Sequence, residues 1–301
     1  MTHYNKKKPI TYGVGVEWSF ELEDSLFENL DKFSCFELIP ENFFKQGDDF
    51  LDKLAKLEVP TVIHGVELSI GSYEPIKKEH FERIKEISER VNCIGVSEHL
   101  AMTESNGVEI GQLTPLNWSN ELADRISEKI DYVMNNLSVP FSIENVTNRF
   151  VIPDTELSET DFINKILANT GCGFLIDLNN IDTNAYNYGF DPYKWMDSIN
   201  YNSITSVHLA GGVFDEEGVL LDSHSAPVRE RVWDLYTYLT NKIIPEVTIV
   251  EWTDHCPGLQ VLLKDADRAN QILNNALYNQ NLTSNYIPQS YLNAGGIANE
   301  S

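Results

Sequence analysis

The chain has 301 residues, of which 42% are hydrophobic and 23% are charged, so it can bury one large core. Its 46 acidic and 22 basic residues give a net charge of -24, which disfavours nucleic acid and anionic membranes as partners. No apolar signal segment follows the lysine-rich N-terminal stretch, and no apolar run reaches the roughly 18 residues of a membrane span. We therefore expect a cytoplasmic globular protein with no membrane segment and no nucleic acid partner.

Eight short apolar segments of strand-like composition are separated by longer amphipathic segments. They cover residues 10–16, 35–40, 61–65, 93–99, 141–145, 173–179, 204–210 and 247–252. Between them, residues 79–91 repeat apolar side chains at helical spacing. Strands that alternate with helices indicate parallel βαβ units, and eight such units close a (β/α)8 TIM barrel of the α/β class. We expect one barrel domain over residues 1–278 and a polar tail over residues 279–301.

The four cysteines, Cys35, Cys93, Cys172 and Cys256, are far apart and form no C-x-x-C pair. Three of them lie in apolar segments, so we expect buried free thiols rather than disulfides. Free thiols agree with a reducing compartment.

Six consecutive predicted strands end in a side chain that can bind a metal ion. In chain order they are His64, His99, Glu144, Asp177, His208 and Glu251. Residues two apart on a strand share a face, so these side chains all point into the barrel while residues such as Ile63 and Val207 point outward. Because the C-terminal strand ends form the active site of a TIM barrel, the pattern predicts a metal centre there.

Glu98 and His99 are neighbours on one predicted strand, so only one of them can point into the barrel. We predict that His99 binds metal and that Glu98 supports it. Glu144 lies in the middle of the series and is the candidate to bridge two metal ions. A set of carboxylate and imidazole ligands without cysteine suits iron, manganese or zinc, and the ligands alone do not choose among them. The sequence contains no G-x-S-x-G motif and no P-loop.

Two further segments carry polar residues that can extend this centre. Asn179 and Asn180 follow Asp177 directly, and Asp222 and His224 share a face if that segment is extended, so a third metal position is predicted. Outside the series, His255 is either a loop residue or an acid or base of the active site. His80 is expected to face solvent at the start of a helix.

At these residues the sequence resembles the multinuclear non-heme iron-dependent oxidative enzymes, typified by the oxygenase subunit of methanobactin biosynthesis, within the xylose-isomerase-like TIM barrels. The matching stretches, in chain order, are PENFF at 40–44, HGVELSIGS at 64–72, SEHLAMT at 97–103, IENV at 143–146, GCGFLIDLNN at 171–180, VHLAGG at 207–212, LDSHS at 221–225 and IVEW at 249–252.

The resemblance implies two or three irons of mixed ferrous and ferric state, with dioxygen as cosubstrate, and oxidation of a residue of a ribosomally made precursor peptide, most often cysteine. It also implies a small partner protein that binds the leader of that peptide. In this likeness one iron is held by His64 and His99, Glu144 bridges, and the second iron is held by Asp177, His208 and Glu251. The third position is lined by Asn180, Asp222 and His224. We assign catalytic roles to Glu144, His255 and Glu98 and substrate contacts to Glu17, Asn42 and Asn179.

Three other classes of protein fit part of this pattern. The three-metal apurinic endonucleases, which are zinc-dependent hydrolases, share the ligand spacing, but they carry a histidine where this chain has Asn180. They also need a basic face for DNA, which the net charge of -24 argues against. A metalloenzyme like the sugar isomerases is a further alternative. A barrel that only stores metal or serves as a scaffold would not need ligands around an open centre.

Overall fold

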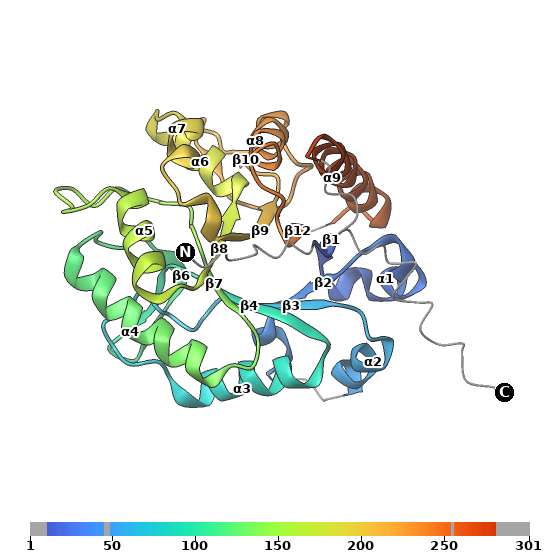
Figure 1. The fold of residues 1–301 in the computed structure, drawn as a ribbon, viewed down its shortest axis with the longest axis horizontal. Coiled ribbons are helices and arrows are strands. Elements are labelled where there is room, and N and C mark those ends of the chain that lie inside the picture. The colour runs from blue at the N-terminus through green and yellow to red at the C-terminus, as the bar shows by residue number, and fades with distance from the viewer. Residues whose placement is uncertain (1–10, 45–48, 254–255, 281–301) are drawn as a thin grey trace, which may run out of the picture.

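The computed structural model describes residues 11–44, 49–253 and 256–280. Eight parallel strands close a barrel in the order β1-β12-β9-β8-β7-β4-β3-β2, and helices surround it (Figure 1). The strands are β1 (Gly13–Glu17), β2 (Phe36–Leu38), β3 (Thr61–Gly65), β4 (Cys93–His99), β7 (Phe141–Glu144), β8 (Gly173–Asp177), β9 (Ile204–Leu209) and β12 (Val247–Val250). Each one lies in a segment predicted as a strand, or overlaps it, so the (β/α)8 barrel is confirmed.

The helices follow the strands along the chain and cover the outside of the barrel. They are α1 (Glu23–Glu28), α2 (Asp49–Leu57), α3 (Lys78–Arg90), α4 (Asn120–Asn136), α5 (Glu159–Thr170), α6 (Leu178–Tyr188), α7 (Pro192–Asp197), α8 (Glu230–Thr240) and α9 (Leu259–Asn279). In α3 the residues predicted to repeat on one face, Phe81, Ile84 and Ile87, are buried against the barrel. The predicted tail lies outside the described residues, except for Asn279 at the end of α9 and Gln280 after it.

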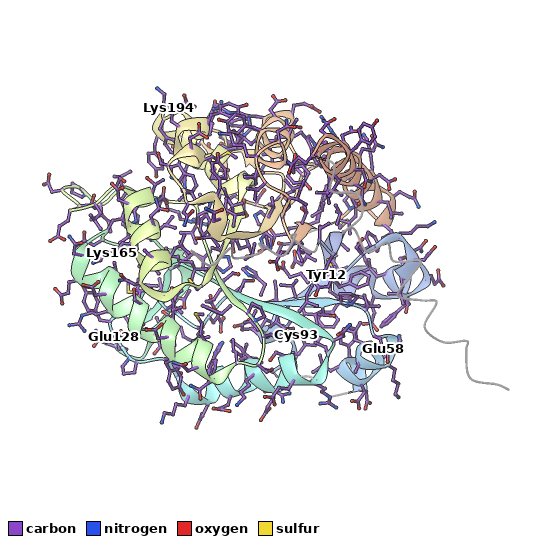
Figure 2. The ribbon with its side chains drawn as sticks, viewed as in Figure 1. Tyr12, Glu58, Cys93, Glu128, Lys165 and Lys194 are labelled. Atoms are coloured by element: carbon purple, nitrogen blue, oxygen red, sulfur yellow. The ribbon has the colours of Figure 1, made fainter. Side chains whose placement is uncertain are left out.

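Strand alternation divides the apolar side chains into two layers. Ile63, Ile143 and Val207 point outward and belong to the large core between barrel and helices, where side chains fill the space (Figure 2). Burial of each such side chain contributes about 1.5–3 kcal/mol. A second, smaller cluster of Cys35, Val62, Val247 and Ile249 fills the barrel interior. We call this cluster the inner apolar plug, and polar residues occupy the C-terminal ends of the strands beside it.

Two hairpins, which the sequence analysis did not predict, extend from the C-terminal end of the barrel. The first pairs β5 (Met102–Ser105) with β6 (Val108–Thr114), and the second pairs β10 (Val213–Phe214) with β11 (Leu220–Leu221). The first hairpin turns at Asn106 and Gly107, whose φ angles are 52° and 76°. An Asn-Gly pair with two positive φ angles is the favoured two-residue turn between antiparallel strands.

The four cysteines are free, as predicted, but they differ in burial: Cys35 and Cys172 are buried, whereas Cys93 and Cys256 are half-buried. Burial raises the pKa of the Cys93 and Cys172 thiols to about 11, so both stay protonated and unreactive at neutral pH. Among the described residues, none of the helices combines the length and apolar character needed to cross a bilayer.

Candidate metal centre

Seven predicted ligands meet at the C-terminal end of the barrel and form what we call the metal centre. Their ligand atoms make four overlapping groups, and within each group the atoms lie within 4.8 Å of one another. The groups are His64–His99–Glu144, His64–His208–Glu251, Glu144–Asp177–His208 and Asp177–His224–Glu251. Six of the seven residues stand at or directly after the end of a barrel strand, and His224 comes from the loop after β11.

Glu144 lies in the middle of the metal centre. One carboxylate oxygen, Oε2, is 3.1 Å from His64 Nε2 and 3.3 Å from His99 Nε2. The other oxygen, Oε1, is 3.4 Å from His208 Nδ1. Each oxygen of this buried carboxylate therefore faces a different set of imidazoles, which is the arrangement that a bridging ligand requires.

Glu251 repeats this arrangement on the opposite side. Its Oε1 is 3.1 Å from His208 Nδ1, and its Oε2 is 3.5 Å from His224 Nδ1. Asp177 is fully buried and belongs to two groups, Glu144–Asp177–His208 and Asp177–His224–Glu251. The metal centre is thus a continuous row of ligands that extends from His64 to His224.

Hydrogen bonds to the second ring nitrogen orient three of the histidines. His99 Nδ1 donates to the carbonyl oxygen of Gly65 at 3.2 Å, which leaves Nε2 free to bind a cation. His64 Nδ1 is 2.9 Å from Ser97 Oγ, and His208 Nε2 is 2.9 Å from Glu37 Oε2. Such contacts fix the ring orientation and the tautomer of a metal-binding histidine.

Asp177 is held by backbone contacts as well as by its place on β8. Its Oδ1 caps α6 by accepting from the Asn180 N–H at 2.8 Å. Asn145 accepts from the Asp177 N–H at 2.9 Å and donates to the Asp177 carbonyl at 3.0 Å. With one oxygen used as the helix cap, the other, Oδ2, is left to the metal centre.

The carboxyl groups of the metal centre have widely different pKa values. Burial alone would raise the pKa of Glu144, but the three surrounding imidazoles hold it well below its usual range. Burial would also raise the pKa of Glu251, and two imidazoles lower it to about 2. Burial and the neighbouring carboxylates Glu144 and Glu251 raise the pKa of Asp177 well above its usual range. A cation between these carboxylates would relieve their repulsion.

Several polar atoms of the metal centre are buried and lack a hydrogen bond with acceptable angles. They are Glu144 Oε2, Asp177 Oδ2, His208 Nδ1 and Glu251 Oε2. A buried polar atom that lacks a hydrogen bond destabilises a fold by about 1–3 kcal/mol. Metal coordination would satisfy all four atoms, and nitrogen and carboxylate donors suit iron, manganese or zinc. The residues therefore fit a cluster of metal cations.

Residues 13–274 match the family described as RiPP precursor modification enzyme MbnB/TglH/ChrH, where a RiPP is a ribosomally made, modified peptide. The chain belongs to this family. A UPF0276 protein of Psychromonas ingrahamii is 30% identical over 86% of this chain and 93% of its own length. A UPF0276 protein of a Caulobacter species is 33% identical over 79% of this chain and 88% of its own. The resemblance stated from the sequence is thus confirmed at the level of the family.

Solved structures support the fold of this RiPP precursor modification enzyme. A D-tagatose 3-epimerase-like protein has a TM-score of 0.55 at 17% identity, covering 90% of this chain and 99% of that chain. A xylose isomerase domain protein from Planctomyces limnophilus has a TM-score of 0.53 at 12% identity, covering 90% and 99%. At these identities the likeness concerns the barrel alone, and it agrees with the (β/α)8 fold.

In this family member, the loop that carries Asp222 and His224 reaches the metal centre through side-chain contacts. His224 Nε2 is 2.7 Å from Asp222 Oδ1, and Asn179 Nδ2 donates to the same oxygen at 2.7 Å. Thr147 Oγ1 lies 2.6 Å from Asn180 Oδ1 and 3.1 Å from Asp222 Oδ2. The φ of His224 is 45°, in the left-handed region, and such local strain is typical of functional sites.

The other predicted site residues differ in burial and in their place in the barrel. Glu98 points away from the barrel interior, is buried, and accepts hydrogen bonds from the backbone of His99 and Leu68 at 2.9 and 3.1 Å. Glu17 is buried at the end of β1, and its pKa is raised to about 7 by burial and by nearby carboxylates. Asn42 is exposed on the turn after β2. His255 lies outside the described residues.

Glu37 was not predicted as a site residue, but it is fully buried inside the barrel and contacts His208. A signal was available, because Glu37 interrupts an apolar strand two residues after Cys35 and so shares its inward face. The prediction that His80 faces solvent is wrong. Its Nε2 is 2.8 Å from Glu41 Oε1, and only 14% of its side chain is exposed.

Proposed function

We propose that this RiPP precursor modification enzyme is an iron-dependent oxidase or oxygenase that oxidises a cysteine of its precursor peptide. Dioxygen is the electron acceptor: it is reduced as the cysteine is oxidised. The observation that carries the proposal is the metal centre, in which seven buried or half-buried ligands without cysteine lie together and two of them, Glu144 and Glu251, are placed to bridge. A peptide that is modified before export keeps its thiols reduced in the cytoplasm, which is the compartment we assign.

The proposed ligand assignment follows the four groups of the metal centre. The first position takes His64, His99 and Glu144, and the second takes Glu144, Asp177, His208 and Glu251. The third position takes His224 with the second oxygen of Glu251, and it is lined by Asn180 and Asp222. Two or three irons of mixed ferrous and ferric state would fill these positions, and the two shared carboxylates, Glu144 and Glu251, would hold them.

The bound irons would supply the redox chemistry with dioxygen and a positive charge that attracts a substrate thiolate. The protein supplies position and exclusion of water. Ser97, Gly65 and Glu37 fix the imidazole rings, and Asn145 fixes the end of β8, so the ligands are organised before the peptide binds. The inner apolar plug closes the barrel below the metal centre, so the substrate enters from the C-terminal mouth.

The leader of the precursor binds a second, small protein in our proposal, since the likeness stated from the sequence implies such a partner. The net charge of -24 favours a basic partner. Gel filtration of the co-expressed pair should give a joint peak that contains both chains. Full activity of the isolated chain on a peptide without its leader would contradict this part of the proposal.

The function is tested by co-expression with the precursor peptide encoded beside the gene, followed by mass spectrometry of the peptide. We expect a mass change that disappears when the target cysteine is replaced by serine. A mass change that survives the Cys→Ser replacement would contradict the cysteine assignment. An unchanged peptide, together with cleavage of abasic DNA by the purified protein, would replace the oxidase proposal with the zinc hydrolase.

A further inference from the structure

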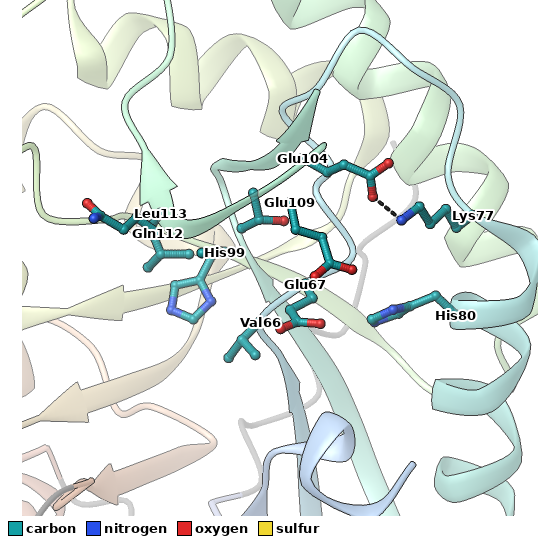
Figure 3. Close-up of a pocket in the computed structure, with 11 residues that line it drawn as sticks. Val66, Glu67, Lys77, His80, His99, Glu104, Glu109, Gln112 and Leu113 are labelled. Carbon is teal, nitrogen blue, oxygen red and sulfur yellow. Dashed lines mark ion pairs between the residues drawn. The ribbon is translucent and has the colours of Figure 1, made fainter. Parts of the chain in front are cut away.

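A cavity of about 330 Å³ opens beside the metal centre, and His99 belongs to both (Figure 3). Its other walls come from the segment after β3, from the start of α3 and from the β5–β6 hairpin. In Figure 3 the ring of His99 lies on one side of the cavity, whereas His80 and Lys77 lie on the opposite side. A peptide residue in this cavity would therefore be close to a residue bound at the metal centre.

The wall formed by the β5–β6 hairpin is fixed to the barrel. Ser69 Oγ accepts hydrogen bonds from the backbone N–H groups of Thr103 and Glu104 at 2.8 and 3.1 Å. Lys77, at the start of α3, forms an ion pair with Glu104 across the cavity rim. The cavity is thus built from anchored elements, and its volume matches the lower end of the range for ligand pockets.

The charge of the cavity is negative after its internal ion pairs are counted. Lys77 neutralises Glu104, and His80 is occupied by Glu41. Glu67 and Glu109 remain, and within the described part of the chain neither carboxylate forms an ion pair.

Glu109 also stands directly opposite Glu104 in the hairpin register. Like charges at opposed positions of a hairpin destabilise it. Lys77 already offsets part of this repulsion through its ion pair with Glu104, and a second cation beside Glu109 would offset more of it.

A metal ion does not explain these carboxylates. Among the described residues, the groups of three or more possible metal ligands take only His99 from the cavity, so its carboxylates form no such group. Val66, Leu113 and the methylene groups of Gln112 add an apolar lining next to His99. An apolar stem below a cationic head is the form of a lysine or arginine side chain.

We propose that this cavity binds a lysine or arginine side chain of the precursor peptide, near the residue that is modified. The inference rests on the proposed function for its substrate. The cationic head lies between Glu67 and Glu109, and the stem of the side chain packs toward His99. The cavity then sets which sequence next to the target residue is accepted and in which direction the peptide runs.

The test measures binding of labelled precursor peptides to the metal-containing protein without oxygen, so that no turnover occurs. Each of the three positions on either side of the target residue is replaced in turn by lysine, glutamine or glutamate. At one position we expect lysine to bind about five- to tenfold more tightly than glutamate, with glutamine between them. In the Glu67→Lys/Glu109→Lys double variant, the order at this position should reverse.

The matched control is Glu128→Lys, because Glu128 is exposed on α4 (Figure 2) and does not line the cavity. This control should keep the preference for lysine, which separates the cavity from the general acidity of the chain. Equal binding of the three peptides at every position, or a preference that the double variant keeps, would overturn the proposal. The proposed function can fail separately. In that case the peptide binds with the preference for lysine, but its mass stays unchanged when oxygen is supplied.

Discussion

The Gly211→Ala substitution tests whether the loop with His224 is part of the metal centre. An alanine Cβ at this position would lie 2.2 Å from the Ala226 carbonyl oxygen and 2.3 Å from that of Pro227. Contacts are ordinary from 3.4 Å, so the returning segment must move by about 1.2 Å. Both obstacles are backbone atoms, so no side-chain rotation relieves the clash. Overpacking of this kind destabilises a fold by about 1–3 kcal/mol.

The displaced segment begins at Ala226, two residues after His224, and the backbone N–H of Ser225 between them donates to the Gly211 carbonyl at 3.2 Å. We therefore expect Gly211→Ala to lose about one metal ion per chain and about a hundredfold in turnover, since a shift near 1 Å is enough for such a loss. The first group of the metal centre, on β3, β4 and β7, should keep its metal. Elemental analysis, thermal unfolding and peptide turnover measure these effects.

Gly95→Ala is the matched control, because the nearest atom to its added Cβ is 3.8 Å away. This variant should keep the metal content, the melting temperature and the activity of the natural protein. If Gly211→Ala bound as much metal as Gly95→Ala and turned over the peptide as fast, His224 would not belong to the metal centre.

Three further predictions concern metal binding and stability. Glu144→Gln should abolish turnover and weaken metal binding about 10–100-fold, while circular dichroism shows an intact fold; unchanged turnover would end the bridging assignment. Protein purified without chelator from iron-supplied cells should contain about two to three irons per chain by elemental analysis, and activity retained with zinc alone would contradict this. Burial lowers the pKa of Lys129 to about 8, although Glu74 opposes this shift. An unfolded chain keeps this proton up to an ordinary pKa of 10.5, so the free energy of unfolding should rise between pH 8 and 10.5. Denaturant titrations of Lys129→Gln should lack that rise, and an identical rise would refute the assignment.

The sequence determined the barrel and the end at which its ligands lie. Eight apolar segments with helical separators already specify βαβ units, and local alternation decides that Ile63 faces the helices while His64 faces the interior. Both properties depend on residues close together in the chain, so they can be read without the tertiary structure. The same alternation places Glu37 on the inward face of its strand, but its contact with His208 could not be predicted from the sequence.

Only the tertiary structure decided which ligands meet. Glu37 and His208 are 171 residues apart, and their 2.9 Å contact follows from strand register and barrel closure. His224 reaches Glu251 because its loop folds back over β9, and the cavity beside His99 exists because an unpredicted hairpin packs against Ser69. These contacts join segments that are distant in sequence, and their geometry is set by the packing of the whole barrel rather than by any local pattern.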